Sequence, residues 1–181
     1  YNNIMKDFFT CNAFSKEFEI KNKFSIFQDH LHPVKQYELK PVNTEFKCQW
    51  YQKTINKKKP FVVIPIRNCS NLLEYTLENF YKNNMFEHAN VIVVDDRSDE
   101  DLKTIVDKYP VSFLKTEYNV NFNFSMLNNI AALLSYSLGG DTLILWNSDL
   151  WIDKIEHFTK LLKMHKQEGS TISGSKLLYP N

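Results

Sequence analysis

From residue 60 onward, short apolar runs alternate with stretches in which apolar residues recur three and four positions apart. The short runs are apolar on both faces, as expected for strands buried in a parallel sheet; they span residues 61–64, 91–94, 111–114 and 142–146. The other stretches have the spacing of one helix face; they span residues 71–84, 102–109, 125–138 and 153–166. Alternating strands and helices predict an α/β fold with a mostly parallel sheet, right-handed crossovers and helices on both faces.

Individual residues suggest where several of these elements begin and end. Ser98, with Asp101 three positions later, has the pattern of a capping box at the start of a helix. Asn71 and Ser125 stand where N-terminal caps are expected. Pro65 is expected to end the first strand, because proline has no N–H to donate to a neighbouring strand. The pair of glycines after residue 138 has the position of a helix C-cap.

Residues 1–59 differ from the rest of the chain in pattern and in charge. Their phenylalanines are irregularly spaced, and they carry 11 Lys and Arg against 6 Asp and Glu, whereas residues 60–181 carry 11 against 15. We therefore place a domain boundary after residue 59 and expect a basic, aromatic-rich extension before it, irregular or helical in structure. Within it, residues 49–55 could form a short helix or a strand. The basic character would suit contact with an anionic membrane surface or a partner domain.

The composition narrows the class of protein further. Of the 181 residues, 43% are hydrophobic, which is ample for a core, and no apolar run approaches the roughly 20 residues that span a bilayer. The net charge of +1 argues against binding nucleic acid through its phosphates. Cys11, Cys48 and Cys69 are odd in number and widely spaced, which predicts neither a disulfide framework nor a zinc site. We expect a reducing, cytoplasmic location, with contact at the inner membrane face through residues 1–59.

Polar residues follow three of the predicted strands at their carboxyl ends, in residues 65–68, 95–98 and 147–149. Parallel α/β sheets bind ligands at this edge, so we expect these loops to converge although they lie far apart in sequence. Neither a G-x-G-x-x-G nor a G-x-x-x-x-G-K-[ST] pattern is present, which argues against a backbone cradle for phosphate. A divalent metal held by Asp149 could neutralise phosphate instead. Asp95 and Asp96 could bind that metal too, or could accept hydrogen bonds from a base or ribose.

Four segments occur in an order and at spacings that resemble the family 2 glycosyltransferases with the GT-A fold. They are VVIPIRN over residues 62–68, VVDDRS over 93–98, LWNSD over 145–149 and GSKLLYPN over 174–181. The resemblance covers residues 60–181 and involves nothing before them. It implies transfer of a sugar from a nucleoside-diphosphate sugar to an acceptor hydroxyl, in the synthesis of a bacterial surface polysaccharide or glycoconjugate.

The resemblance also implies roles for individual residues. Asp149 would hold a divalent metal, Mn²⁺ or Mg²⁺, that bridges the diphosphate of a UDP- or dTDP-linked donor, and Asp96 would hydrogen-bond the base. The residues that would bind the donor nucleotide are Pro65, Ile66, Arg67, Asn68, Asp95, Asp96, Asn147 and Ser148. Asn147 stands at the first position of the family's D-x-D motif, and the resulting N-x-D form is similar to that of rhamnosyltransferase-like members.

In this family the catalytic base and the region that binds a carbohydrate or glycolipid acceptor lie well beyond the metal motif. We therefore expect both after Asn181, and no catalytic residue is identified within the chain. On this interpretation, residues 60–181 are the nucleotide-sugar-binding part of a transferase domain that is truncated at its C-terminal end. Whether such a fragment is active on its own stays open.

Two other functional interpretations stay open as well. A phosphoacceptor receiver domain also has paired acids at the end of one strand and an aspartate after a later one. Its acid pair ends the first strand, however, whereas here a strand and a helix over residues 61–84 precede the pair. A non-catalytic nucleotide- or sugar-binding relic of the transferase fold would account for Asn147 and for the truncation. Considered alone, acids at a strand end can also be solvated turn residues.

Overall fold

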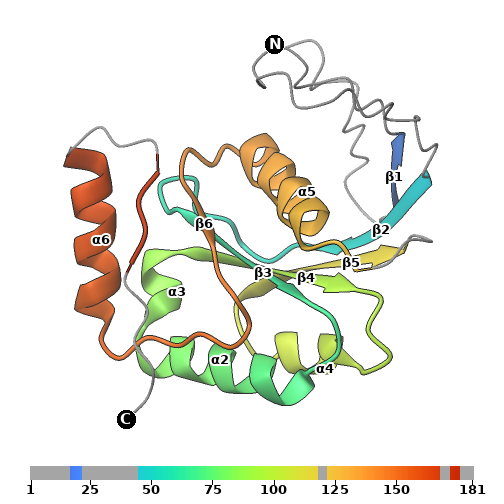
Figure 1. Ribbon diagram of the computed structural model, residues 1–181, viewed down its shortest axis with the longest axis horizontal. Helices are drawn as coiled ribbons and strands as arrows, with labels where there is room; N and C mark the ends of the chain where they lie inside the picture. The colour runs from blue at the N-terminus through green and yellow to red at the C-terminus, as the bar shows by residue number, and fades with distance from the viewer. Residues whose placement is uncertain (1–16, 22–44, 118–121, 168–171, 176–181) are drawn as a thin grey trace, which may run out of the picture.

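The computed structural model describes residues 17–21, 45–117, 122–167 and 172–175, which form a sheet with helices on both faces (Figure 1). The strands of this part of the chain are β1 (Glu17–Lys21), β2 (Glu45–Tyr51), β3 (Phe61–Ile66), β4 (Asn90–Asp96), β5 (Val111–Glu117) and β6 (Leu143–Leu145). Its helices are α2 (Ser70–Lys82), α3 (Met85–His88), α4 (Leu102–Val106), α5 (Phe124–Ser137) and α6 (Ile155–Gln167). From β3 onward the elements occur in the predicted order, except that the short helix α3 was not predicted.

The strand order in the sheet is β1-β2-β5-β4-β3-β6. Strands β5, β4, β3 and β6 run parallel, while β2 pairs antiparallel with both β5 and β1. This mostly parallel sheet with helices on both faces confirms the predicted fold class. From β3 the chain adds β4 and β5 on one side, then returns through α5 and places β6 on the other side of β3. The order therefore reverses between β3 and β6, which is where open α/β sheets bind ligands.

The hydrophobic core lies on both faces of the sheet, because successive side chains of a strand point to opposite faces. On one face, Val62 and Ile64 of β3 pack with apolar residues of α2, α3, α4 and α6. On the other face, Phe61 and Val63 pack with apolar residues of α5 and with Trp50 of β2. Figure 1 shows α5 on one side of the sheet and α2 and α4 on the opposite side. The apolar runs in the sequence are continuous because both faces of these strands are buried.

Strand β6 is an edge strand and is only partly covered. Its three residues pair with residues 61–63 of β3, and within the described part of the chain no strand pairs with its outer edge. Leu143 and Leu145 leave 38% and 56% of their surface exposed. The strand is shorter than the predicted range of 142–146.

Pro65 lies within β3 and does not end it, so this expectation is wrong. It pairs in register with Val94 of β4. Main-chain groups two residues apart point to the same side of a strand, and the carbonyl of Val63 accepts from the N–H of Trp146 on the β6 side. Pro65 therefore faces the β6 side as well. Since β6 ends at Leu145, opposite Val63, none of the described strands needs the donor that proline lacks.

The predicted cap at Ser98 is wrong, and so is the one at Ser125. Helix α4 begins at Leu102 and its N-cap is Asp101, which accepts from the N–H of Thr104 at 3.3 Å. Ser98 lies too far before that helix to cap it. Helix α5 is capped by Asn123, whose side chain accepts from the N–H of Met126 at 3.0 Å. The end of α5 is as expected, with Gly139 in the left-handed region at φ 89°.

The predicted cap at Asn71 is also wrong, because α2 begins one residue earlier and is capped from elsewhere in the chain. Cys69 precedes the helix with φ 59° and its side chain makes no cap hydrogen bond. Instead, the Glu100 carboxylate accepts from the N–H groups of Cys69 and Ser70, at 3.2 and 2.8 Å. These are two of the N–H groups that a helix start leaves without an internal partner.

The sheet extends across the expected boundary after residue 59. Strand β2, which belongs to the segment expected to be an extension, pairs with β5 and buries Cys48 and Trp50. A short helix and a strand were both open for residues 49–55, and residues 49–51 belong to a strand. The expectations for residues 1–16 and 22–44 lie outside the described residues. Among the described residues, no helix is both long and apolar enough to cross a membrane.

Candidate functional site

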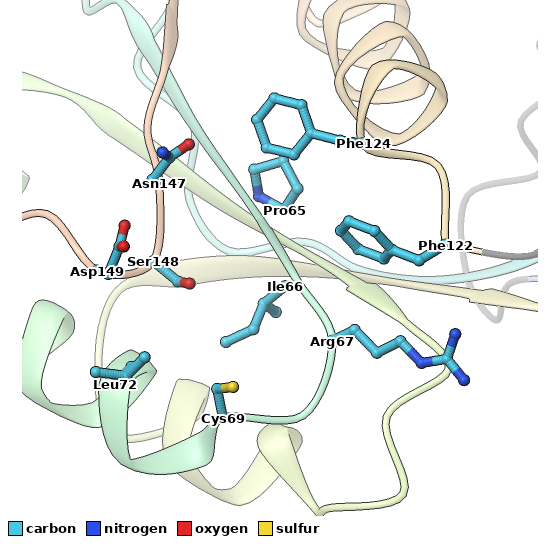
Figure 2. A pocket seen from close by; sticks show the side chains of 10 residues that line it. All are labelled: Pro65, Ile66, Arg67, Cys69, Leu72, Phe122, Phe124, Asn147, Ser148 and Asp149. Atoms are coloured by element: carbon cyan, nitrogen blue, oxygen red, sulfur yellow. The ribbon is translucent and has the colours of Figure 1, made fainter.

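A cavity of about 470 Å³ lies at the carboxyl ends of β3 and β6, where the strand order reverses (Figure 2). Pro65, Ile66 and Arg67 line it from the end of β3. Asn147, Ser148 and Asp149 line it from the loop that follows β6. Because Val63 of β3 pairs with Leu145 of β6, the two loops leave neighbouring strands at the same edge. The structure thus places two of the three expected loops at the cavity, and the third, after β4, contacts the β3 loop through Asn68.

Four residues that the sequence did not single out complete the lining of the cavity. Cys69 and Leu72 belong to the start of α2, and Phe122 and Phe124 lie at the start of α5. In Figure 2, Phe124 lies across from Pro65 and Phe122 projects into the same space. The two phenylalanines are 44% and 43% exposed, so they present an apolar surface to the cavity. They gave no periodic signal because Phe122 precedes α5 and Phe124 is its first residue, away from the buried face of the helix.

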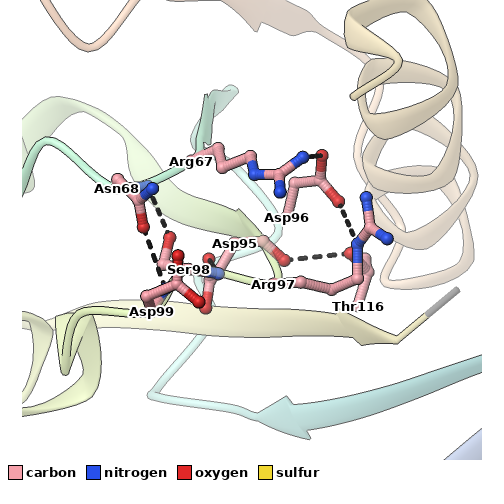
Figure 3. Close-up of polar contacts among 8 residues, drawn as sticks. All are labelled: Arg67, Asn68, Asp95, Asp96, Arg97, Ser98, Asp99 and Thr116. Carbon is pink, nitrogen blue, oxygen red and sulfur yellow. Dashed lines mark hydrogen bonds and ion pairs between the residues drawn. The ribbon is translucent and has the colours of Figure 1, made fainter. Parts of the chain in front are cut away.

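Asp96 lies behind the cavity and does not line it. Its side chain is fully buried between two arginines (Figure 3): Arg97 Nε donates to Oδ1 at 3.0 Å, and Arg67 Nη1 lies 4.0 Å from Oδ2. Among the described residues, Oδ2 accepts no hydrogen bond. A buried carboxylate oxygen without a donor is uncommon. Arg67 both lines the cavity and approaches this oxygen, so one side chain connects Asp96 to the cavity.

Asp95 is buried as well and organises the turn after β4. Its Oδ1 accepts from the N–H of Ser98 at 2.9 Å, and its carbonyl accepts from the Thr116 hydroxyl at 3.0 Å. Burial raises the pKa of the Asp95 carboxyl above its ordinary value, while hydrogen bonds from Ser98 and the charge of Lys115 lower it. Asp95 does not line the cavity, and these contacts assign its carboxylate to holding the turn.

Asn68 joins the loops that follow β3 and β4. Its N–H donates to the Ser98 hydroxyl at 2.7 Å, and its side-chain oxygen accepts from the N–H of Asp99 at 2.9 Å (Figure 3). Asn68, Cys69 and Arg97 have φ values of 56°, 59° and 52°, in the left-handed region that few residues other than glycine adopt. Such strained positions persist where surrounding contacts hold them, often beside functional sites. Asn68 itself does not line the cavity.

The chemistry of the β6 side centres on Asp149. Its side chain is exposed at the cavity, next to the amide of Asn147 and the hydroxyl of Ser148. Within the described residues, no group of three or more His, Cys, Asp and Glu side chains is placed to hold a metal ion. A cation at Asp149 would therefore share one carboxylate and neighbouring neutral oxygens with ligands from a bound molecule. Mg²⁺ and similar ions bind in this way, through one or two carboxylates, water and substrate phosphates.

Comparison with known proteins decides the family. The model of glycosyl transferase family 2 matches residues 61–180, which include both cavity loops. This chain belongs to glycosyl transferase family 2. The resemblance of the four sequence segments is thereby confirmed. The interpretation as a phosphoacceptor receiver domain is wrong, because the acid pair ends the second parallel strand of a glycosyltransferase fold.

Similarity to the solved structure of TarS shows that this glycosyltransferase domain has the GT-A fold. TarS from S. aureus, solved in complex with UDP-GlcNAc, superposes with a TM-score of 0.52 at 20% identity, over 67% of this chain and 37% of that one. The mannosyltransferase PcManGT from Pyrobaculum calidifontis, solved with GDP-Man and Mn²⁺, superposes with a TM-score of 0.49 at 17% identity, over 64% and 33%. The chain thus spans about a third of the length of these structures. A search among curated proteins found no match.

Proposed function

We propose that this glycosyltransferase domain binds the nucleoside diphosphate of a sugar donor in the cavity between β3 and β6. The observation that carries the proposal is the pairing of β3 with β6, which sets residues 65–67 beside residues 147–149. This places one carboxylate, two neutral oxygen atoms that could bind a metal, and Arg67 around one space, at the edge where the strand order of the sheet reverses. The domain would supply the donor half of a reaction in which an acceptor hydroxyl takes the sugar.

The residues at the end of β6 fit a divalent metal, Mn²⁺ or Mg²⁺. Asp149 would hold it by its carboxylate, with the amide oxygen of Asn147 as the second protein ligand. When bound, the ion would neutralise the charge that develops on the nucleoside-diphosphate leaving group. Because the described residues offer one carboxylate at the cavity, the diphosphate itself would be needed to complete the metal's shell. We therefore expect the metal and the nucleotide to bind together.

On the β4 side, the proposal assigns recognition of the base to Asp96. Its Oδ2 is buried, negatively charged and without a hydrogen bond among the described residues, so it can accept one from a base N–H. A base would reach it once the partly exposed Arg67 has moved from its place 4.0 Å away. That guanidinium would then be free to pair with a phosphate. Phe122 and Phe124 would provide an apolar wall on which the base or the sugar stacks.

The proposal extends to a UDP- or dTDP-linked donor, a carbohydrate or glycolipid acceptor, and a role in bacterial surface polysaccharide synthesis. The N-x-D form of the motif supports a function similar to that of the rhamnosyltransferase-like members of the family. A cytoplasmic reaction at the inner membrane face is part of the same proposal, and the free thiols of Cys48 and Cys69 support a reducing compartment. The catalytic base is proposed to lie after Asn181.

Calorimetric titration with UDP, dTDP and GDP tests the proposal. Each nucleotide is titrated with Mn²⁺, with Mg²⁺ and after chelation of all divalent ions. We expect binding of at least one nucleotide with a metal and none after chelation. Binding of equal strength after chelation would contradict the role of Asp149. Absence of binding by all three nucleotides under every condition would contradict the proposed function.

A further inference from the structure

Helix α2 presents a row of polar side chains to the loop that joins β6 to α6, residues 146–154, which carries Asp149. Figure 1 shows this loop running alongside α2 before it enters α6. The side chains are Thr76, Asn79 and Asn83, spaced three and four residues apart and therefore on one face of the helix. None of them touches the cavity, and the sequence pattern did not single them out.

Thr76 makes the contact nearest to Asp149. Its hydroxyl donates to the carbonyl of Ser148 at 2.7 Å and lies 3.4 Å from the carbonyl of Leu150. A hydroxyl has one proton, so the shorter contact is the hydrogen bond. Thr76 is fully buried, and its bond is shielded from competing water. The residues on both sides of Asp149 are thus in contact with one side chain of α2.

Asn79 holds the loop two residues further along, through both main-chain groups of Ile152. The N–H of Ile152 donates to Asn79 Oδ1 at 2.8 Å, and Asn79 Nδ2 donates to the carbonyl of Ile152 at 3.0 Å. Asn83 Nδ2 approaches the same carbonyl at 3.3 Å. The side-chain amide of Asn79 pairs with the loop as a neighbouring strand would.

The loop depends on these contacts because the sheet ends before it. Strand β6 stops at Leu145, and the last main-chain bond from this segment to β3 runs from the N–H of Trp146 to Val63. Beyond that point, Trp146 Nε1 donates to the carbonyl of Leu150 at 3.0 Å, and its ring packs edge-to-face on Phe80 of α2 at 5.2 Å. The main chain at residues 148, 150 and 152 is therefore tied to α2 or to Trp146, which itself rests on α2.

We infer that Thr76 and Asn79 are positioning residues that hold the main chain of residues 148–152 and so fix Asp149 at the cavity. Metal binding by Asp149 rests on the proposed function. The hydrogen bonds of Thr76 and Asn79 to the loop, called the clamp below, do not depend on it. Thr76 would act through Ser148, on the residue next to the metal ligand, and Asn79 would keep the loop from sliding along the helix. Removal of either should loosen the loop more than it loosens the sheet.

Substitution of Thr76 tests the inference with two independent readouts. Thr76→Val keeps the shape and removes the hydroxyl, Thr76→Ser restores the hydroxyl, and Asn79→Ala removes the half-buried amide. Ser135→Ala is the matched control, because Ser135 is buried and its hydroxyl donates at 2.7 Å to a carbonyl within α5. The readouts are amide hydrogen exchange over residues 147–153 and the affinity for UDP in the presence of Mn²⁺.

For Thr76→Val we expect loop exchange and the dissociation constant for UDP with Mn²⁺ each to rise about three- to tenfold, the effect of one lost hydrogen bond. For Asn79→Ala, which loses two hydrogen bonds to Ile152, both should rise at least as much. Thr76→Ser should restore both values, and Ser135→Ala should change neither. Unchanged loop exchange in Thr76→Val and Asn79→Ala would overturn the clamp, as would an equal effect in Thr76→Ser. If the wild-type chain bound no nucleotide, the proposed function would fail while the exchange data would still decide the clamp.

Discussion

Arg67 Nη1 lies 4.0 Å from Oδ2 of Asp96, and the two residues differ sharply in exposure. The side chain of Asp96 is 0% exposed, whereas that of Arg67 is 41% exposed and lines the cavity. The carboxylate is fixed in place by its burial and by Arg97, so the arginine is the partner that can move. The proposed base-binding oxygen is thus covered by a side chain that also faces the ligand space.

Asp96→Asn should weaken binding of UDP with Mn²⁺ by about tenfold to a hundredfold, because a hydrogen bond to a charged oxygen is replaced by one to a neutral amide. Calorimetry measures the change, and thermal denaturation shows whether the variant remains folded. Asp99→Asn is the control, since Asp99 is exposed on the same turn. Equal affinities for wild type and Asp96→Asn would contradict the assignment of the base to Asp96.

Asp149→Ala should abolish metal-dependent nucleotide binding and leave the fold intact. The side chain is exposed, and exposed substitutions away from caps and ion pairs typically change stability by less than about 0.5 kcal/mol. Titration with UDP and Mn²⁺ gives the first result, and the melting temperature gives the second. Asp153→Ala, an exposed aspartate on the same loop, should bind as the wild type does. If Asp149→Ala titrated like the wild type, the metal would have to be held elsewhere.

Phe124→Ala should weaken nucleotide or nucleotide-sugar binding about five- to a hundredfold, as expected for loss of one aromatic stacking partner. Its stability should change little, because Phe124 is 43% exposed. The matched control is Tyr136→Ala, an aromatic residue of α5 that is 60% exposed and does not line the cavity. Should both variants bind equally well, the phenylalanine wall would have no part in donor binding.

Glu100→Gln should lower the melting temperature at neutral pH, because Glu100 caps α2. Hydrogen bonds from Ser70 and then Cys69 hold the pKa of Glu100 below its ordinary value in the folded chain. The ionised carboxylate therefore stabilises the fold above its ordinary pKa, and this contribution is lost as the pH falls through the folded-state pKa. The difference in melting temperature between wild type and variant should shrink on acidification. Glu87→Gln, an exposed residue of α3, serves as control, and a difference that stays constant with pH would contradict the cap.

The strands were predictable because they are buried on both faces. Residues of β3 and β4 contact helices on one side of the sheet and α5 on the other, so each run is apolar throughout. The parallel sheet followed from the alternation of strands and helices, and the meeting of the β3 and β6 loops followed from the parallel strands, whereas the strand order itself was not predicted. Buried strands and the loops at their carboxyl ends can therefore be predicted from the hydrophobic pattern of the sequence.

The cap of α2 was not predictable, because its partner comes from a distant loop, whereas the caps of α4 and α5 are local and were misplaced by three and two residues. Ser98 has the pattern of a cap, but its hydroxyl accepts from Asn68, and α2 is capped by Glu100 from the loop after β4. Thr76 likewise lies in an ordinary helical pattern until the chain brings Ser148 against it. Phe122 and Phe124 look like core residues by composition, but Phe122 precedes α5, Phe124 is its first residue, and both side chains are exposed.

The partly covered strand β6 has a consequence for laboratory work. An unpaired strand edge can accept a strand from a second molecule, and exposed leucines favour such contact. Three residues offer few main-chain groups, so pairing through this edge should be weak and should depend on protein concentration. Affinities measured in concentrated solution would then include self-association, and light scattering at the calorimetric concentration would separate the two equilibria.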